Sequence, residues 1–384
     1  MKIVYYGNTL NRHQAYLADA LYDITNGDYK YIETVPPTSA NKTEGKKAVE
    51  RSYVFRAYES QETWQEAIRM AKDADVALFG ACSLQFEVAR MNLNEPGLAF
   101  EVSERWLKRG WVNLFSPRLL SNMWHYHVGR WKKKPIYKLC SSAYGAGDQY
   151  KLFSFKDRCY KWGYFTNVVD ALDVRRLHRE ANPEITSIMW CGRFLKWKHP
   201  EIALKLAYRL KESGYFFILN MYGDGEEFSH AQALVEQLGI QDVVRFKGNR
   251  SNDEIQESMR HSDIFLFTSD QREGWGAVVN EAMSNGSVVV ASSAVGSAPF
   301  LVKDGINGFV FNLNDLDSLF EKVTYLILHP REREQMGSNA YSSMLHIWSP
   351  QRASLNLLTL ISDLQKGDDT SIVEGPCSKA IELY

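Results

Sequence analysis

The sequence has no uninterrupted apolar run long enough to cross a membrane, so it predicts no transmembrane helix. Its 45 Lys and Arg against 46 Asp and Glu leave a net charge of −1, which argues against nucleic-acid binding through a general basic field. The five cysteines are scattered without a C-x-x-C pair, and neither a disulfide framework nor a zinc site is expected. The N-terminal residues do not have the composition of a signal peptide. We therefore expect a reduced, cytoplasmic protein with no nucleic-acid partner.

Apolar, β-prone runs alternate with amphipathic helical segments along both halves of the chain. The pattern begins at residue 2, pauses at a polar connection over about 170–183, and restarts at residue 185. Such alternation is typical of parallel sheets covered by helices on both faces. The sequence predicts the α/β class, with two Rossmann-like doubly wound parallel-sheet domains over 1–168 and 184–345 facing each other across a cleft. A helix is expected over 350–366, followed by a mobile tail at 367–384.

The stretch 269–286 carries two glutamates, Glu273 and Glu281, eight residues apart between two expected buried strands. Gly274 and Gly276 stand where a helix over 277–284 begins, and exposed amides at a helix N-terminus attract phosphate. A nearby carboxylate can accept hydrogen bonds from sugar or ribose hydroxyls. The setting predicts a site for a phosphorylated sugar, although two glutamates at this spacing are also common on solvated helices.

Three more loops follow expected strands of the second half, and ligands of doubly wound sheets bind where strands end. Arg193 and Lys198 come directly after the first strand and suit a diphosphate, whereas Lys196 between them is interpreted as solvated. The loop Gly223–Gly225 is either part of the site or a simple turn. Arg245 and Lys247 flank a phenylalanine at a further strand end, a weaker candidate for contact with a base ring.

In order and spacing, these segments resemble the family 4 retaining glycosyltransferases, over about residues 185–330 and the terminal helix. The segments are Gly192-Arg193 with Lys198, Tyr222–Gly225, Val244–Gly248, Arg272–Gly276 followed by Asn280–Met283 and Gly286, and Val302–Gly308. The sequence departs from the family pattern at Phe300, where an acidic residue is usual, and at Ser287, where proline is common. The first loop has Gly7-Asn8 instead of paired glycines.

The resemblance implies the GT-B fold, with a donor-binding C-terminal domain and an acceptor-binding N-terminal domain to which helix 350–366 returns. It implies that the donor is a nucleotide sugar, most often a UDP-sugar, and that no cofactor or metal is needed. Arg193, Lys198 and Glu273 are implied as catalytic, with Glu281 on the ribose. The full implied donor set is Gly7, Gly192, Arg193, Lys198, Gly223, Arg245, Lys247, Glu273, Gly274, Trp275, Gly276 and Glu281.

The implied activity is retaining transfer of a sugar to a glycan or lipid-linked acceptor, in bacterial surface polysaccharide biosynthesis. Alternatives are a nucleotide-sugar epimerase or phosphorylase on the same fold, or a non-catalytic nucleotide-sugar-binding protein. On the acceptor side the candidates are His13, Ser103 and Glu104, each equally open to a structural role.

Residues 105–138 contain nine Lys and Arg, four tryptophans and no acidic residue. Basic residues beside aromatic ones suit contact with anionic lipid headgroups, which would make the protein peripheral at the inner face of the cell membrane. The alternative is a solvated basic face with its tryptophans packed inward.

Overall fold

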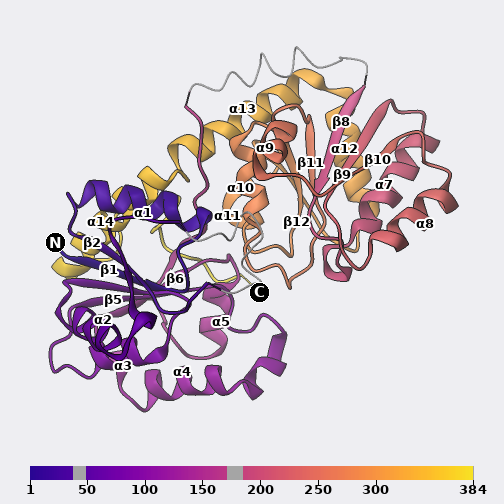
Figure 1. The fold of residues 1–384 in the computed structure, drawn as a ribbon. Coiled ribbons are helices and arrows are strands. Elements are labelled where there is room, and N and C mark those ends of the chain that lie inside the picture. Colours follow the sequence, from indigo (N-terminus) through magenta and orange to yellow (C-terminus); the bar gives the residue numbers. More distant parts are fainter. Residues whose placement is uncertain (38–48, 171–184, 384) are drawn as a thin grey trace. The chain divides into compact units, whose positions relative to one another are not determined.

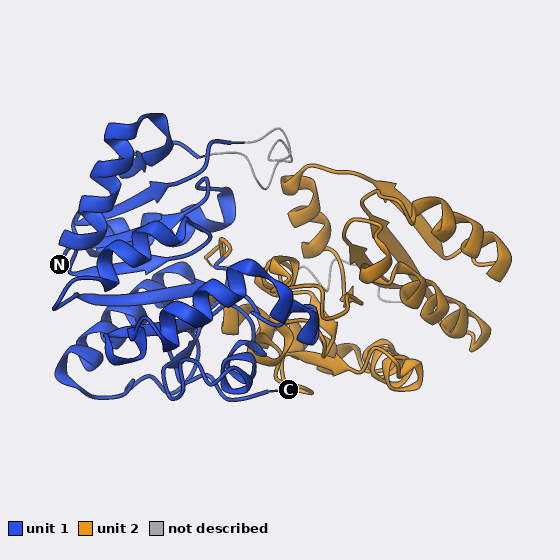
Figure 2. Ribbon diagram, turned by 90° about the horizontal axis from the view of Figure 1, so that it is seen from below, with its two compact units in different colours: residues 1–165, 347–384 blue, residues 166–346 orange. Residues whose placement is uncertain are grey.

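The computed structural model describes residues 1–37, 49–170 and 185–383 and divides the chain into two compact units (Figures 1 and 2). Unit 1 comprises residues 1–165 and 347–384, and unit 2 comprises residues 166–346. The polar connection expected over 170–183 lies almost entirely outside the described residues. In the described part of the chain, no helix has both the length and the apolar character to cross a membrane.

Unit 1 is built on a seven-stranded parallel sheet of order β3-β2-β1-β4-β5-β6-β7. Its strands are β1 (Ile3–Gly7), β2 (Tyr29–Glu33), β3 (Val54–Arg56), β4 (Val76–Phe79), β5 (Leu98–Ser103), β6 (Ile136–Cys140) and β7 (Cys159–Lys161). Most strand residues are buried, as expected of a parallel sheet covered on both faces.

Helices α1 and α14 pack together on one face of this sheet, and α2 and α3 pack on the other (Figure 1). The α-helices of unit 1 are α1 (Arg12–Ile24), α2 (Gln61–Asp73), α3 (Leu84–Met91), α4 (Pro117–His127), α5 (Gly145–Lys151) and α14 (Pro350–Lys366). Short 3-10 turns are η3 (Ala57–Glu59), η4 (Gly110–Phe115) and η5 (Trp131–Lys133). The last helix, α14, therefore belongs to the unit formed by the N-terminal residues.

The segment after α14 pairs with the edge strand β7, whereas the sequence predicted a mobile tail. The Lys161 amide donates to the Ser378 carbonyl (2.8 Å), and the Ala380 amide donates to the Cys159 carbonyl (3.0 Å). Cys377 is fully buried. An edge strand leaves a row of backbone groups unpaired, and the C-terminal residues satisfy those of β7.

Unit 2 is built on a six-stranded parallel sheet of order β10-β9-β8-β11-β12-β13. Its strands are β8 (Thr186–Cys191), β9 (Phe217–Tyr222), β10 (Val244–Gly248), β11 (Ile264–Phe267), β12 (Val288–Ser292) and β13 (Gly308–Phe311). The helices are η6 (Lys196–Lys198), α7 (Pro200–Glu212), α8 (Phe228–Leu238), α9 (Asn252–Arg260), α10 (Ala277–Ser284), α11 (Ala298–Leu301), α12 (Leu316–Leu328) and α13 (Pro330–His346).

The chain of unit 2 starts at β8 in mid-sheet, adds strands outward on one side, and then continues from β11 on the other. This is the doubly wound order whose direction reverses between the first and fourth strands, here β8 and β11. The predicted α/β class with two doubly wound parallel sheets is confirmed. The reversal point is where such sheets bind ligands, outside the carboxyl ends of the strands.

Candidate functional site

An ion pair between Lys198 and Glu273 lies at the reversal point of unit 2. Lys198 ends the turn η6 after β8, and Glu273 lies in the loop after β11. Their side chains are only 12% and 16% exposed. The Thr268 hydroxyl donates to the Lys198 carbonyl at 2.7 Å and accepts from the Trp190 indole at 2.9 Å. These bonds fix the loop after β8 to the loop after β11, so the two charges meet at a defined place.

Glu281 lies close to the same strand end, in the second turn of α10. The pKa of the Cys191 thiol is raised to about 12, mainly by burial. The Glu281 carboxylate adds to this pKa rise and the Lys198 ammonium opposes it, so both charges lie near the end of β8. The structure thus brings together three of the predicted residues, Lys198, Glu273 and Glu281.

Glycines let the loops after β8 and β9 pass each other closely. At Gly223, with φ +118°, an added Cβ would lie 2.0 Å from the Gly192 carbonyl oxygen. At Gly225 it would lie 2.4 Å from the Phe194 carbonyl oxygen. A side chain at either position would push the two loops apart, so Gly223–Gly225 is a close-packed part of this edge and more than a simple turn.

Gly276 caps the N-terminus of α10 with φ +86°, and a Cβ there would lie 2.6 Å from the Phe267 ring. The neighbouring Trp275 is fully buried and its indole donates to the Asn280 side chain at 2.7 Å. The Trp275 indole is therefore part of the core, and the donor role predicted for Trp275 would fall to its backbone. The Phe300 ring lies 6.3 Å from the Trp275 ring, so this departure from the family pattern packs beside the loop.

The remaining predicted donor residues are dispersed. Arg193 is exposed, and its guanidinium makes no hydrogen bond or ion pair with the described residues. Arg245 lies near the start of β10 and donates to the Gln241 and Val244 carbonyls, away from the carboxyl edge where the sequence analysis placed it. Lys247 is half-buried in the second half of β10. Gly7 ends β1 in unit 1, where a Cβ would lie 2.1 Å from the Tyr31 hydroxyl.

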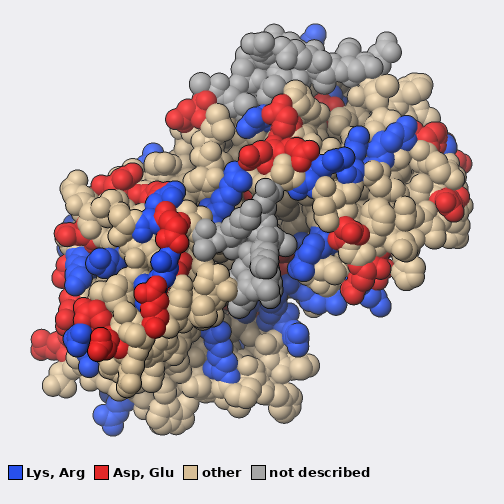
Figure 3. Space-filling view, in the orientation of Figure 1, with Lys and Arg blue, Asp and Glu red and all other residues tan. Residues whose placement is uncertain are grey.

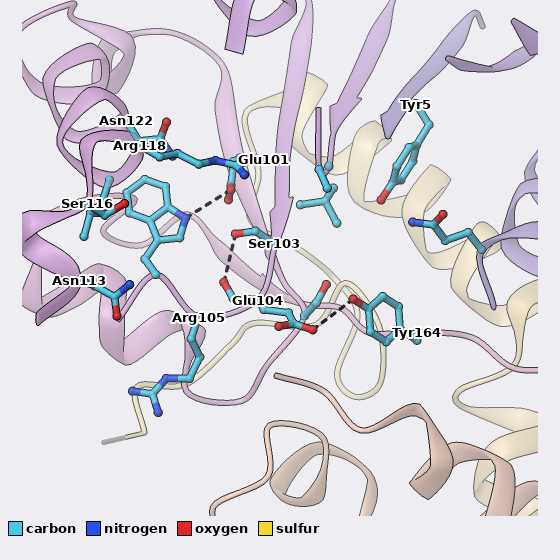
Figure 4. Close-up of a pocket in the computed structure, with 17 residues that line it drawn as sticks. Tyr5, Glu101, Ser103, Glu104, Arg105, Asn113, Ser116, Arg118, Asn122 and Tyr164 are labelled. Atoms are coloured by element: carbon cyan, nitrogen blue, oxygen red, sulfur yellow. Dashed lines mark hydrogen bonds between the residues drawn. The ribbon is translucent and has the colours of Figure 1, made fainter. Parts of the chain in front are cut away.

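A second polar site lies in unit 1, where a cavity of about 440 Å³ opens at the carboxyl ends of its strands (Figure 4). Two of the three predicted acceptor-side residues, Ser103 and Glu104, line it. The third, His13, lines a smaller neighbouring cavity of about 30 Å³, and its pKa is lowered by burial and by Arg12. The polar lining of the larger cavity is Gln14, Glu101, Ser103, Glu104, Arg105, Asn113, Ser116, Arg118, Asn122, Ser141 and Tyr164.

The sequence analysis missed the ion pair of Glu101 and Lys138 in this cavity. The two residues are register partners on the adjacent strands β5 and β6. The Lys138 side chain is completely buried; it also donates to the Ser103 hydroxyl at 2.8 Å and lies 4.8 Å from the Trp106 ring centre. The pair presents a carboxylate to the cavity with its charge compensated from behind. A charged residue in each of two otherwise apolar runs was the signal that could have revealed it.

The loop that follows β5 is held by a second buried pair. Arg105 binds both carboxylate oxygens of Asp148, at 2.8 and 3.2 Å, and the Leu107 amide donates to the same carboxylate at 2.9 Å. Asp148 therefore positions the loop. Glu104 accepts from Lys108 (3.1 Å) and from the Tyr164 hydroxyl (3.2 Å), which orients it at the cavity wall.

One more carboxyl group lies close to this cluster. Burial raises the pKa of Glu87, on α3, to about 8, and the carboxylate of Glu101 adds to the rise, while Lys138 and Arg118 lower it. Burial thus favours the protonated, neutral form of Glu87. Arg118, from α4, has no hydrogen-bond or ion-pair partner within the described residues and extends toward Glu101 in Figure 4. The cavity offers carboxylate, hydroxyl, amide and guanidinium groups in a small volume, as a hydroxyl-rich ligand would need.

Within residues 1–37, 49–170 and 185–383, no group of three or more His, Cys, Asp or Glu side chains could hold a metal ion. That the reaction needs no metal or cofactor stays a prediction.

Two doubly wound parallel-sheet units, with charged groups at the carboxyl edges of both sheets, define the GT-B class of fold. Residues 176–343, which make up most of unit 2, match the family model "Glycosyl transferases group 1". A structure of HepE from Anabaena, solved in complex with UDP, shares the fold with a TM-score of 0.68 and 18% identity, and covers 94% of this chain and 100% of that one. Sucrose-phosphate synthase from Thermosynechococcus elongatus shares it with a TM-score of 0.67 and 13% identity, over 96% and 100% of the two chains.

The chain is also similar to the lipopolysaccharide core biosynthesis glycosyltransferase LpsE of Rhizobium meliloti. The two are 25% identical over 197 residues, which are 51% of this chain and 55% of that protein. The match to N-acetyl-alpha-D-glucosaminyl L-malate synthase of Bacillus anthracis is 28% identical over 150 residues. It spans 39% of this chain and 38% of that synthase, so these sequence matches span about two fifths to just over half of each relative.

Proposed function

We propose that the protein transfers a sugar from a nucleotide-sugar donor to a hydroxyl-bearing acceptor, with the donor bound by unit 2. The observation that carries this proposal is the Lys198–Glu273 pair at the reversal point of a sheet that matches the group 1 glycosyl transferases. A partly exposed lysine beside a helix N-terminus can neutralise a diphosphate, and the carboxylate that balances it can turn to the sugar hydroxyls.

In this proposal each residue of unit 2 has a separate task. Lys198, with the exposed Arg193, stabilises the negative charge that develops on the departing diphosphate. The amides at the start of α10 bind phosphate oxygens, Glu273 accepts hydrogen bonds from the sugar and Glu281 from the ribose. The bond from the anomeric carbon to the diphosphate oxygen breaks, and the acceptor oxygen forms the new bond from the same side. Because the new bond forms on the side from which the diphosphate leaves, the configuration of the anomeric carbon is retained. The acceptor proton passes to the departing diphosphate, and no metal takes part in this proposal.

The cavity of unit 1 is proposed to hold the acceptor. Glu101, oriented by Lys138 and Trp106, can accept a hydrogen bond from an acceptor hydroxyl, and Ser103 and Asn122 can bind its neighbours. A UDP-sugar is the proposed donor because fold neighbours were solved with UDP. A role in surface polysaccharide synthesis is proposed because LpsE acts in lipopolysaccharide core biosynthesis.

The experiment compares Lys198→Ala with Lys196→Ala, two lysines of the same turn. UDP release from a panel of UDP-sugars, with and without glycan acceptors, should fall roughly 100- to 1000-fold in Lys198→Ala, as when a preorganised donor to a developing anion is lost. Lys196 is exposed, and Lys196→Ala should stay within about twofold of the parent. Equal loss in both variants, or none in either, would contradict the assignment of Lys198.

A further inference from the structure

Unit 1 exposes a set of large apolar and aromatic side chains on η4, on α4 and at the end of α4, here called the α4 face. Its members are far more exposed than large apolar side chains usually are on a soluble surface. They are Trp111 (59% exposed), Val112 (67%), Phe115 (85%), Leu120 (53%), Trp124 (56%) and Val128 (62%).

Helix α4 is apolar on two sides. Leu119 and Tyr126 are buried, and Tyr126 packs on Phe155 with ring centres 4.4 Å apart, so this side holds the helix to unit 1. Leu120 and Trp124 follow at helical spacing on the outer side, which the inner packing does not require. The outer apolar stripe therefore needs another explanation.

Positive charge flanks the α4 face. Arg109 precedes η4, and Arg130, Lys132 and Lys133 follow α4; all four are exposed. None of their charged groups has a hydrogen-bond or ion-pair partner in the described part of the chain. Residues 105–138 contain no acidic residue. In the space-filling view the surface at the position of α4 is mainly uncharged, with Lys and Arg nearby (Figure 3).

The tryptophans of this segment divide between the two interpretations of the sequence. Trp131 is buried and Trp106 packs in the cavity against Lys138, as an inward-packed face would have them. Trp111 and Trp124 instead point their rings to solvent. A solvated basic face with inward-packed tryptophans therefore accounts for two of the four tryptophans, but it does not explain why the side chains of the α4 face are exposed.

We propose that the α4 face binds the surface of an anionic lipid bilayer. Aromatic and aliphatic side chains along one helix insert at the boundary of headgroups and acyl chains, and flanking Lys and Arg pair with anionic headgroups. A second copy of this chain fits the face less well, because it would bring the same unpaired cations against each other. A bilayer supplies both an apolar layer and the opposite charge.

The α4 face and the unit 1 cavity are made by the same segment. Asn113, Ser116, Arg118, Leu119 and Asn122 line the cavity from η4 and α4, beside the exposed members of the face. Docking would therefore bring the cavity mouth to the headgroup layer. If the cavity holds the acceptor, this favours an acceptor carried on a lipid; that extension rests on the proposed function, whereas the docking itself does not.

The test is sedimentation of the full chain with phosphatidylcholine vesicles, with and without phosphatidylglycerol, in the absence of any donor. The protein should sediment with anionic vesicles only, and less at high salt. The triple variant Trp111→Ser, Phe115→Ser and Trp124→Ser should bind at least roughly tenfold more weakly, because interfacial affinity scales with buried apolar area. Lys132→Gln with Lys133→Gln should weaken binding and reduce its salt dependence.

Phe216→Ser is the matched control, since Phe216 is 74% exposed in unit 2, outside the α4 face. It should leave vesicle binding unchanged. Circular dichroism and melting temperature check that the exposed substitutions leave the fold intact. Unchanged vesicle binding by the triple variant, or equal binding to neutral vesicles, would overturn the proposal. So would a dimer in solution that the triple variant abolishes, which would assign the face to a second copy. A protein that binds vesicles but transfers no sugar would overturn the proposed function alone.

Discussion

The carboxyl edges of the two sheets are built from the same topology but in different ways. In unit 2, glycines bring two loops into contact and leave a partly exposed ion pair, Lys198–Glu273, at the surface of the edge. In unit 1, side chains from β5, η4 and α4 surround a cavity of about 440 Å³, and the compensating cation, Lys138, is completely buried.

The difference shows how one fold can hold two kinds of ligand. An edge of backbone amides and an accessible lysine suits a flexible, highly charged diphosphate, which pairs with mobile cations. A cavity with a carboxylate fixed from behind suits a neutral, hydroxyl-rich ligand, whose recognition needs oriented hydrogen bonds. We therefore expect the two lysines to respond differently to the same substitution.

The largest contrast in stability should come from Lys138→Met against Lys198→Met. Removing the buried Lys138 leaves Glu101 uncompensated and should cost roughly 3–5 kcal/mol of the free energy of unfolding. Lys198 is 12% exposed, whereas Lys138 is completely buried, so Lys198→Met should cost less, roughly 1–2 kcal/mol, while it abolishes donor use. Urea unfolding curves measure both, and adding Glu101→Gln to Lys138→Met should recover most of its loss. An equal loss of the free energy of unfolding in Lys138→Met and Lys198→Met would contradict the proposed difference between the two units.

The close approach of the two loops in unit 2 can be tested by comparing Gly223→Ala with Gly214→Ala. Both glycines have positive φ, but a Cβ at Gly214 meets nothing within 4 Å, whereas one at Gly223 lies 2.0 Å from the Gly192 carbonyl. Gly214→Ala should therefore cost only the backbone strain, roughly 1 kcal/mol. Gly223→Ala should cost roughly 2–3 kcal/mol and weaken UDP binding, because the loops must separate. Similar melting temperatures and equal UDP affinity in both variants would remove Gly223 from the site.

The third prediction concerns pH and the buried carboxyl group of Glu87 beside the unit 1 cavity. The folded-state pKa of Glu87 is about 8, above the ordinary value of 4.5, so the folded protein retains a proton that the unfolded chain has lost. Stability should fall as pH rises from about 4.5 to about 8, with a slope of about 1.4 kcal/mol per pH unit from this group.

Glu87→Gln should remove that slope. The difference between its melting temperature and that of the parent protein should therefore increase from pH 5 to pH 8 and stay constant above pH 8. Glu62→Gln, at an exposed position of α2, is the matched control and should run parallel to the parent. A constant difference between Glu87→Gln and the parent across this range would contradict a raised pKa.

More of the residues at the unit 2 edge than at the unit 1 cavity were singled out from the sequence, and the reason is physical. Gly192 and Gly223 follow strand ends directly, and Gly276 begins the next helix, so their place at the edge depends only on local order. Glu101 and Lys138 meet because β5 and β6 pair in one register, which depends on the whole sheet. The C-terminal segment is a second case in which tertiary pairing matters. Its polar composition predicted a mobile tail, but in the structure it forms backbone hydrogen bonds with the edge strand β7.

Two other differences have local causes. Helix α13 was not predicted because residues 330–346 are largely polar, with no clear apolar stripe. Arg245 was placed at the carboxyl edge from its position in the chain, but its guanidinium binds carbonyls at the start of β10. Arg245 and Lys247 are two residues apart and share a face of a regular strand, so they differ in their position along it: Arg245 lies near the start of β10 and Lys247 near its carboxyl end.

Hydrogen exchange of the full chain with and without UDP, followed by mass spectrometry, tests the central claim that unit 2 holds the donor. We predict protection by UDP in residues 192–198, 223–225 and 268–277, and no protection in residues 101–122, which line the unit 1 cavity. The same experiment on Lys198→Ala should show little protection in either region. Protection confined to residues 101–122, or protection of unit 2 that survives Lys198→Ala unchanged, would contradict this assignment.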